Sequence, residues 1–387
     1  MYKVWDYLRK NTDRRHPTSI AKMRKDENIN AYIGDKETIN RLLKDMANIM
    51  NLEDGGSDYK PEAEWRLYFD DFKKFYGDKE RYERDDSDED DSYIANVMRI
   101  KNLYYNRTFS EKEIDSIIDG IMATRTLDSK SAQELVRKVE DNMTTVFYKR
   151  TPRHICKVQE PELADRELLK DNLAIIQKAI DDNVRIQFRF NGYSYEKKLE
   201  PVRAEMDELS PYYIVASGGK YYLLAAKEYE GYKPNMSIWR IDLMTDIEIP
   251  GRNDRLHIKG IPRIPKKNVS NLPEKWSEDF QLKHLNMSFD KPVPVTLRIK
   301  SEKCEGNPKK RVRPGYTFLH DWFGDSFTYI RTEKEPPYDD IVRVECSPYG
   351  MAHWALQYSE LVEVLEPESL REDIKNKIKA LNEKYSL

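Results

Sequence analysis

The chain has 387 residues, of which 39% are hydrophobic and 35% are charged, and its formal net charge is −3. A chain of this length is expected to fold as two or three domains, because one hydrophobic core stops growing at about 250–300 residues. The weak negative charge excludes a uniformly basic coat for nucleic acid. The first fifty residues nevertheless hold eleven Lys and Arg against seven Asp and Glu, so any nucleic-acid site is expected to be local.

The three cysteines, Cys156, Cys304 and Cys346, are odd in number and far apart, which is typical of a reducing compartment. His154 lies close to Cys156, but one such pair does not complete a zinc site, so we expect no metal and no cofactor. Charged residues interrupt the first apolar positions, and no apolar run approaches the ~20 residues of a membrane span. We therefore expect a cytoplasmic protein without a membrane partner.

The first fifty residues are expected to form three helices. Val4, Trp5 and Leu8 give the first helix an apolar stripe. Pro17 suits the first turn of a second helix, which would carry Ile20 and Met23.

The third helix, expected between Asp35 and Asn51, has the clearest pattern. Its apolar residues recur at steps of three and four and would bury one face, made of Ile39, Leu42, Leu43, Met46, Ile49 and Met50. The opposite stripe is expected to carry Lys36, Asn40 and Lys44, with Arg41 beside it. Any amphipathic helix needs a solvated face, so this pattern alone does not require a nucleic-acid partner.

Two aromatic segments, 65–76 and 93–105, are expected to form the strands of a wing. Between them, residues 85–91 place six acidic side chains in seven positions. Like charges at this density repel each other and bury nothing, so we expect a solvated or disordered loop. The alternative is that this run imitates nucleic acid or screens the wing from DNA.

Residues 109–183 are expected to form a helical connector. Ser110 with Glu113, and Ser131 with Glu134, each match the capping box that starts a helix. The second of these helices is expected to turn inward Ala132, Leu135, Val136 and Val139. A third helix, near residues 165–182, aligns Leu169, Leu173, Ile176 and Ile180.

From Val184 the apolar residues alternate with polar ones, which indicates strands. Asn191-Gly192 and Gly218-Gly219 are expected to form tight turns. Short strands are expected near residues 184–190, 199–204, 212–216, 221–226 and 237–242, which fits a small barrel. Residues 251–292 are rich in Pro, Lys and Asn and are expected to include a linker. The remaining strands and helices suggest a small α+β module.

Three stretches, in order along the chain, share residues with one family. The first is Lys36-Glu37-Thr38-Ile39-Asn40-Arg41, preceded by Asn11-Thr12-Asp13 and His16-Pro17. The second includes Ser210-Pro211-Tyr212-Tyr213, Tyr221-Tyr222-Leu223 and Trp239-Arg240-Ile241-Asp242. The third is Trp354 with Val362-Glu363-Val364-Leu365-Glu366-Pro367-Glu368-Ser369-Leu370-Arg371. Together they resemble the WYL-domain-containing transcriptional regulators of bacteria.

The resemblance implies a multidomain α+β fold. Its expected parts are a winged helix-turn-helix at 1–108, the connector at 109–183, an SH3/Sm-like β-barrel at 184–250, the linker at 251–292 and a ferredoxin-like WCX module at 293–387. It also implies a homodimer whose barrel binds a nucleotide or a single-stranded nucleic acid as effector. Two positions depart from the family pattern. Tyr221 replaces the Trp of the family name, and Leu243 replaces one of two anion-binding arginines.

The candidate DNA-binding residues lie on the third helix, where cations neutralise phosphates and polar side chains reach base edges. They are Lys36, Thr38, Asn40, Arg41 and Lys44. The resemblance implies that ligand contacts in the barrel come from Tyr222 and Arg240, with Arg203 and Ser210 as weaker candidates, because guanidinium groups grip phosphate and tyrosines stack. The alternative is that Arg240 pairs with Asp242 and that Tyr222 packs in the barrel wall.

The resulting hypothesis is a ligand-responsive, dimeric regulator that binds a double-stranded DNA operator. The alternative is an accessory protein that binds single-stranded nucleic acid or a partner enzyme through its barrel. We expect no enzymatic activity, since the sequence has no Gly-rich phosphate loop, zinc-spaced cluster or Gly-x-Ser-x-Gly turn.

Overall fold

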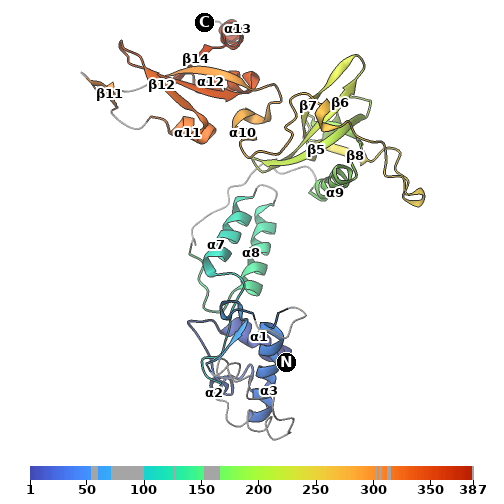
Figure 1. The fold of residues 1–387 in the computed structure, drawn as a ribbon, viewed down its shortest axis with the longest axis vertical. Coiled ribbons are helices and arrows are strands. Elements are labelled where there is room, and N and C mark those ends of the chain that lie inside the picture. Colours follow the sequence, from blue (N-terminus) through green and yellow to red (C-terminus); the bar gives the residue numbers. More distant parts are fainter. Residues whose placement is uncertain are drawn as a thin grey trace. The chain divides into compact units, whose positions relative to one another are not determined.

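A computed structural model describes residues 1–53, 60–70, 100–124, 127–151, 166–300, 303–304, 307–311 and 315–385 (Figure 1). The chain divides into two compact units, Met1–Glu162 and Leu163–Leu387, which we call the N-terminal unit and the C-terminal unit. The fold is mixed α+β. The acidic run at 85–91, Cys156 and His154 lie outside the described residues.

The N-terminal unit begins with α1 (Tyr2–Asn11), α2 (Ile20–Met23) and α3 (Lys36–Asn51). The three expected helices are confirmed, but Pro17 does not start the second one. The side chain of Ser19 accepts a hydrogen bond from the backbone N–H of Lys22 and so caps α2. The helices share one core, which includes Val4, Leu8, Met23, Ile39 and Leu43.

A short antiparallel pair, β1 (Leu67–Tyr68) and β2 (Tyr104–Tyr105), packs on the same core. These residues belong to the two segments expected to form a wing, and most of the residues between them lie outside the described part of the chain. Leu67, Phe69 and Leu103 are fully buried, so the pair is anchored to the helices by its apolar side chains.

Two helices follow, α7 (Glu111–Ala123) and α8 (Ser129–Met143), and they pack against each other. The capping box of Ser110 and Glu113 is confirmed. The one expected at Ser131 is wrong. Asp128 caps α8 instead, because its carboxylate accepts the backbone N–H of Ser131, and Ser131 is already helical. Leu135, expected to face inward, is 40% exposed.

The C-terminal unit opens with α9 (Arg166–Asp182), whose side chains Leu169, Ile176 and Ala179 are buried against a curled sheet. Figure 1 shows α9 beside this sheet, near β8. The helix expected at 165–182 is therefore confirmed. Of the expected connector helices, this one shares its core with the strands that follow it.

The curled sheet has the order β4-β3-β5-β6-β7, and β8 also pairs with β3. Its strands are β3 (Ile186–Tyr193), β4 (Leu199–Pro201), β5 (Asp207–Ser217), β6 (Lys220–Tyr229), β7 (Tyr232–Arg240) and β8 (Met244–Glu248). Because β3 pairs with β4, β5 and β8, the sheet curls as a half-barrel. Its interior includes Ile186, Phe188, Leu223 and Met244.

One of the two expected turns in this sheet is confirmed. Gly218 and Gly219 have φ of 55° and 73°, as required to join β5 to β6 tightly. Asn191-Gly192 is not a turn, because both residues lie inside β3 and the chain reverses only at 194–198. Asn191 is buried, and its amide donates to the carbonyl oxygen of Leu243 and to Thr245 Oγ1.

The segment 251–292, expected to include a linker, packs onto the curled sheet. The Tyr212 hydroxyl donates to the carbonyl oxygen of Ile264, and Ile264 and Val269 are buried beside it. A short helix, α10 (Phe280–Lys283), lies in this segment. The segment therefore closes one side of the sheet.

The C-terminal sheet has the order β12-β13-β9-β14 with antiparallel neighbours. Its elements are β9 (Val293–Ile299), α11 (Thr317–Phe323), β12 (Thr328–Thr332), β13 (Asp340–Cys346), α12 (Pro348–Gln357), β14 (Val362–Glu366) and α13 (Glu368–Tyr385). A separate pair, β10 (Lys303–Cys304) and β11 (Asn307–Arg311), precedes α11. Trp354, Phe323 and Leu297 are fully buried in the core between sheet and helices.

Candidate nucleic-acid interface

Helix α3 begins at a cap that its own sequence supplies. Asp35 accepts hydrogen bonds from the backbone N–H of Thr38 at 2.8 Å and from Thr38 Oγ1 at 2.8 Å. The backbone bond from Thr38, followed by the bond from its hydroxyl, holds the pKa of Asp35 below its ordinary value. Thr38 is exposed, but its hydroxyl already donates to Asp35, so it is available to a ligand mainly as a hydrogen-bond acceptor.

The buried face of α3 is made by Ile39, Asn40, Leu43, Met46 and Ala47. Asn40 was expected on the exposed stripe, and this expectation is wrong, since only 3% of Asn40 is exposed. The reason is the helical period: Asn40 lies three residues before Leu43 and seven before Ala47, which places all three on one stripe. Reading a base edge with Asn40 would require opening the core.

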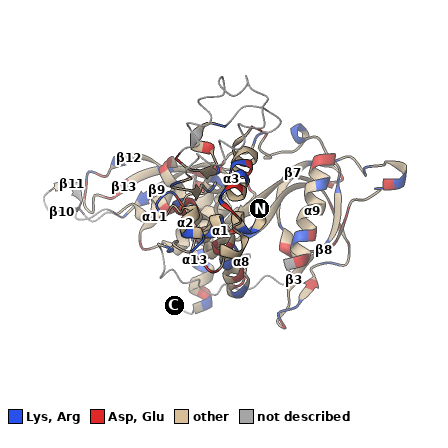
Figure 2. Cartoon of the chain, turned by 90° about the horizontal axis from the view of Figure 1, so that it is seen from below, with Lys and Arg blue, Asp and Glu red and all other residues tan. Residues whose placement is uncertain are grey.

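The exposed stripe runs through Thr38, Arg41, Asp45 and Ile49, which is 69% exposed although it was expected to be buried. Arg41 Nη2 lies 2.9 Å from Glu37 Oε1, and the side chains are 55% and 44% exposed. Lys36 is exposed and Lys44 is half-buried. Figure 2 shows both cationic and acidic residues along α3, so this surface is polar and mixed in sign.

Asn51, at the end of α3, fixes the helix to the β1–β2 pair. Its Nδ2 donates to the carbonyl oxygen of Leu67 at 2.9 Å, and its Oδ1 accepts the backbone N–H groups of Arg66 and Leu67. The residue is fully buried, so these bonds are shielded from water. The sequence does not reveal this positioning residue, because one Asn at a helix end has no distinctive pattern.

In the curled sheet, Tyr222 and Arg240 stand directly opposite each other on β6 and β7. Arg240 donates through Nε and Nη2 to Asp242, at 3.1 and 2.5 Å. Asp242 has a side chain only 2% exposed, and its hydrogen bond raises the pKa of Arg240. The guanidinium fork is therefore occupied by a carboxylate, as the alternative interpretation of the sequence held.

The two weaker candidates lie in other surroundings. Arg203 Nε donates to Asp207 at 2.9 Å, and its guanidinium lies 5.8 Å from the ring centre of Trp239. Ser210 is buried, and its hydroxyl oxygen accepts the backbone N–H of Ile264 at 3.0 Å. The structure thus brings Tyr222 and Arg240 together, whereas Ser210 binds the backbone of the segment that covers the sheet.

A pocket of about 680 Å³ opens beside β7, and none of the four candidates lines it. Phe190 and Trp239 form part of its wall, with ring centres 5.0 Å apart in an edge-on arrangement. Lys227 and Lys233 also line it. Lys227 is paired with the buried carboxylate of Asp207 at 2.7 Å, so the aromatic rings and Lys233 set the chemistry of the pocket, which suits a ligand with an aromatic ring. Leu243, which stands where the family pattern has an arginine, is only 9% exposed.

Within the described residues, no helix combines the length and apolarity needed to cross a membrane. The same residues contain no group of three or more His, Cys, Asp or Glu side chains placed to hold a metal ion. Cys346 is buried, and desolvation raises the pKa of its thiol to about 12, so this cysteine stays protonated at neutral pH.

Comparison with known proteins links one region of the chain to a family. Residues 291–381 match the WCX domain. Among solved structures, proteasome accessory factor B/C (PafBC) of Arthrobacter aurescens is similar at 16% identity with a TM-score of 0.22. The match covers 75% of this chain and 40% of that one. A CRISPR Cas-related protein is similar at 14% identity with a TM-score of 0.30, covering 96% and 93%. No curated protein matches the chain. The C-terminal region is therefore similar to WCX domains.

Proposed function

We propose that this chain is a DNA-binding transcription regulator of the WYL type. In this account α1–α3 and the β1–β2 pair form a winged helix-turn-helix, the curled sheet is the WYL barrel, and the βαββαβ order of the C-terminal sheet is a ferredoxin-like WCX module. The observation that carries the proposal is α3. One face of this helix is fixed in a core by Ile39, Leu43 and Met46, and the other presents Thr38 and Arg41 to solvent.

The geometry of α3 suits insertion into a DNA major groove. Arg41 can leave Glu37 at little cost, because an exposed pair at this spacing stabilises a helix by only about 0.3–0.5 kcal/mol. Its fork would then be available for a guanine edge or a phosphate. Lys36 and Lys44 would lie toward the phosphates, and the buried amide of Asn51 would hold the wing in place beside the helix.

As a dimer, the protein would place two copies of α3 about one DNA turn apart, ~34–36 Å, on an operator with two-fold symmetry. An effector in the barrel would act by binding one dimer arrangement better than another. We place this effector, a nucleotide or a short single strand, in the aromatic pocket at Trp239, since the fork of Arg240 is already held by Asp242. We propose no catalytic role.

The aromatic pocket also supports a second candidate function. Tyr229 and Tyr232 on its rim are 59% and 78% exposed, and Lys233 adds positive charge. Exposed aromatic rings with cations are the usual platform for single-stranded nucleic acid. The chain would then be an accessory protein that binds a strand through its barrel and reads no operator.

Sequencing the nucleic acid that co-purifies with the intact protein separates these candidates. A regulator should retain duplex fragments that share an inverted repeat, and the same repeat should be bound in vitro with a steep loss of affinity as salt rises. Recovery of single-stranded RNA or DNA, with duplex fragments at the background level, would favour the accessory protein.

A further inference from the structure

A second pocket, which the function above does not use, lies within the N-terminal unit. We call it the head pocket, and its volume is about 570 Å³. Three segments form most of its wall: residues 13–15 after α1, residues 105–114 from β2 into α7, and residues 143–148 at the end of α8. The size is within the ~300–1,000 Å³ of small-molecule sites.

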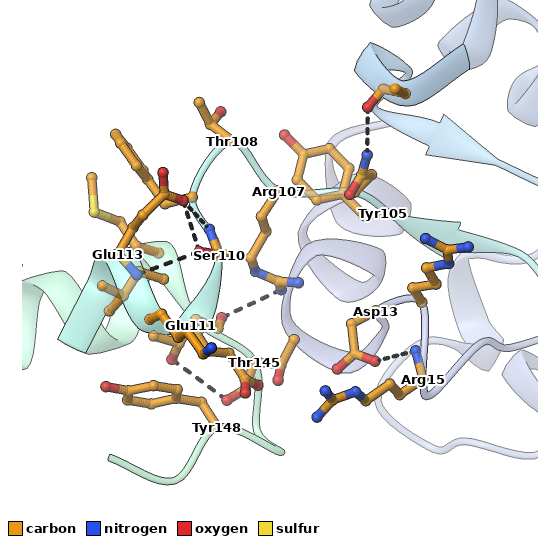
Figure 3. Close-up of a pocket in the computed structure, with 18 residues that line it drawn as sticks. Asp13, Arg15, Tyr105, Arg107, Thr108, Ser110, Glu111, Glu113, Thr145 and Tyr148 are labelled. Carbon is orange, nitrogen blue, oxygen red and sulfur yellow. Dashed lines mark hydrogen bonds between the residues drawn. The ribbon is translucent and has the colours of Figure 1, made fainter. Parts of the chain in front are cut away.

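The head pocket is lined by four cationic residues, Arg14, Arg15, Arg107 and Lys112. Among the residues that the structure describes, none of these cations forms an ion pair. In Figure 3, Arg15 and Arg107 come from different walls and extend into the space between the loop after α1 and the start of α7. Such side chains repel one another unless an anion lies between them.

The carboxylates of the head pocket are Asp13, Glu111 and Glu113. Asp13 and Glu113 accept hydrogen bonds from residues close to them in sequence. Asp13 accepts the backbone N–H groups of Arg15 and His16 and contacts the His16 ring. Burial acts to raise the pKa of Asp13, but the bonds from His16 and Arg15 outweigh it and lower this pKa. The Glu113 carboxylate accepts hydrogen bonds from the backbone N–H of Ser110, as part of the capping box, and from the Ser110 hydroxyl.

Arg107 is the most constrained of the cations. Its Nη1 donates to the carbonyl oxygen of Thr12 at 3.0 Å and its Nη2 to that of Thr144 at 3.4 Å. Desolvation lowers the pKa of Arg107 and outweighs the opposing attraction of Asp13. A guanidinium has five N–H donors, so these bonds orient the fork and leave donors for a ligand.

We propose that the head pocket binds a phosphate ester. Guanidinium forks match phosphate oxygens in geometry and charge, and the pocket combines three of them with an ammonium group. Tyr105 and Tyr148 line the pocket from two different segments and supply ring surfaces beside the charge. The phosphate belongs either to a free nucleotide or to the backbone of a bound duplex. In both cases it would join the loop after α1 to the start of α7.

The test uses the intact chain and three probes: inorganic phosphate, deoxyadenosine monophosphate and a 20-base-pair duplex. Arg14 and Arg15 are exposed, so Arg14→Ala with Arg15→Ala should fold normally. The matched control, Arg137→Ala with Lys138→Ala, removes two exposed charges from α8 outside the pocket. Calorimetric titration and thermal unfolding report the two small probes, and fluorescence anisotropy reports the duplex.

We expect saturable binding of phosphate or of the nucleotide by the parent chain, about tenfold weaker in the Arg14 and Arg15 variant and unchanged in the control. A loss confined to the duplex would identify the DNA backbone as the source of the phosphate. The proposal is overturned if the variant binds all three probes as the parent does, or if none of them binds. The variant Lys36→Ala with Arg41→Ala should bind phosphate as the parent does. Its affinity for the duplex therefore tests the proposed role of α3 separately from the head pocket.

Discussion

Two arginines predicted as functional, Arg41 on α3 and Arg240 on β7, lie in opposite environments. Arg41 pairs with Glu37 across an exposed helix turn, with both side chains near half exposed. Arg240 is held by two hydrogen bonds to Asp242, whose side chain is 2% exposed. An exposed pair is weak and easily replaced by a ligand, whereas a pair with a buried carboxylate resists exchange. The burial of the partner therefore indicates which arginine is available.

The largest effect should follow from breaking the buried pair. Arg240→Ala leaves Asp242 as an uncompensated buried charge and should lower the free energy of unfolding by about 3–5 kcal/mol. Lys198→Ala, which breaks an exposed pair with Glu196 in the turn between β3 and β4, should cost less than about 1 kcal/mol. Urea unfolding followed by tryptophan fluorescence measures both. Equal costs would show that Asp242 does not hold Arg240.

A smaller effect tests the two faces of α3. Asn40→Ala removes a buried polar side chain and should destabilise the protein by about 1–3 kcal/mol. The affinity of the Asn40→Ala variant for DNA, measured well below its unfolding temperature, should stay close to that of the parent. Arg41→Ala should lower the affinity for DNA and leave the free energy of unfolding close to that of the parent. If Asn40→Ala changed the sequence preference of a stable protein, Asn40 would have to be exposed in the complex.

The smallest effect concerns His284, which is buried in the C-terminal unit and stacked on Phe280 at 4.1 Å. Desolvation lowers the pKa of His284 below its ordinary value of 6.5, so the folded state holds the ring neutral. The unfolded chain binds a proton there first, and stability should fall as pH drops below about 6.5.

His284→Asn should reduce this pH dependence, measured as the urea midpoint at pH 7.5 and at pH 5.5. His320→Asn is the matched control, because the side chain of His320 is 64% exposed. An unchanged pH dependence in His284→Asn would mean that other groups cause the loss of stability.

The sequence predicted elements best where a local pattern was reinforced by burial. The helix between Asp35 and Asn51, the Ser110 capping box and the Gly218-Gly219 turn are confirmed, although within that helix Asn40 is buried and Ile49 is exposed. Asn191-Gly192 has the composition of a turn, but β4 pairs with both residues and so extends β3 through them.

The candidate sites were harder to predict than the elements, because availability depends on partners distant in sequence. Asn40 is polar and was therefore expected at the surface, but the stripe of α3 on which it lies is covered by the core. The head pocket joins residues 13–15 to residues 143–148, and no local pattern connects segments so far apart. Whether Lys36, Thr38, Arg41 and Lys44 contact DNA stays a prediction.

The central claim is that the exposed face of α3 binds a duplex. The most direct measurement is the salt dependence of duplex binding by the parent chain, by Lys36→Ala with Arg41→Ala, and by Arg137→Ala with Lys138→Ala. The account predicts that the α3 variant loses affinity at least about tenfold and that its salt slope falls by up to about 1.8, while the α8 variant matches the parent. Equal affinities and slopes in all three proteins, with the fold intact, would contradict the account.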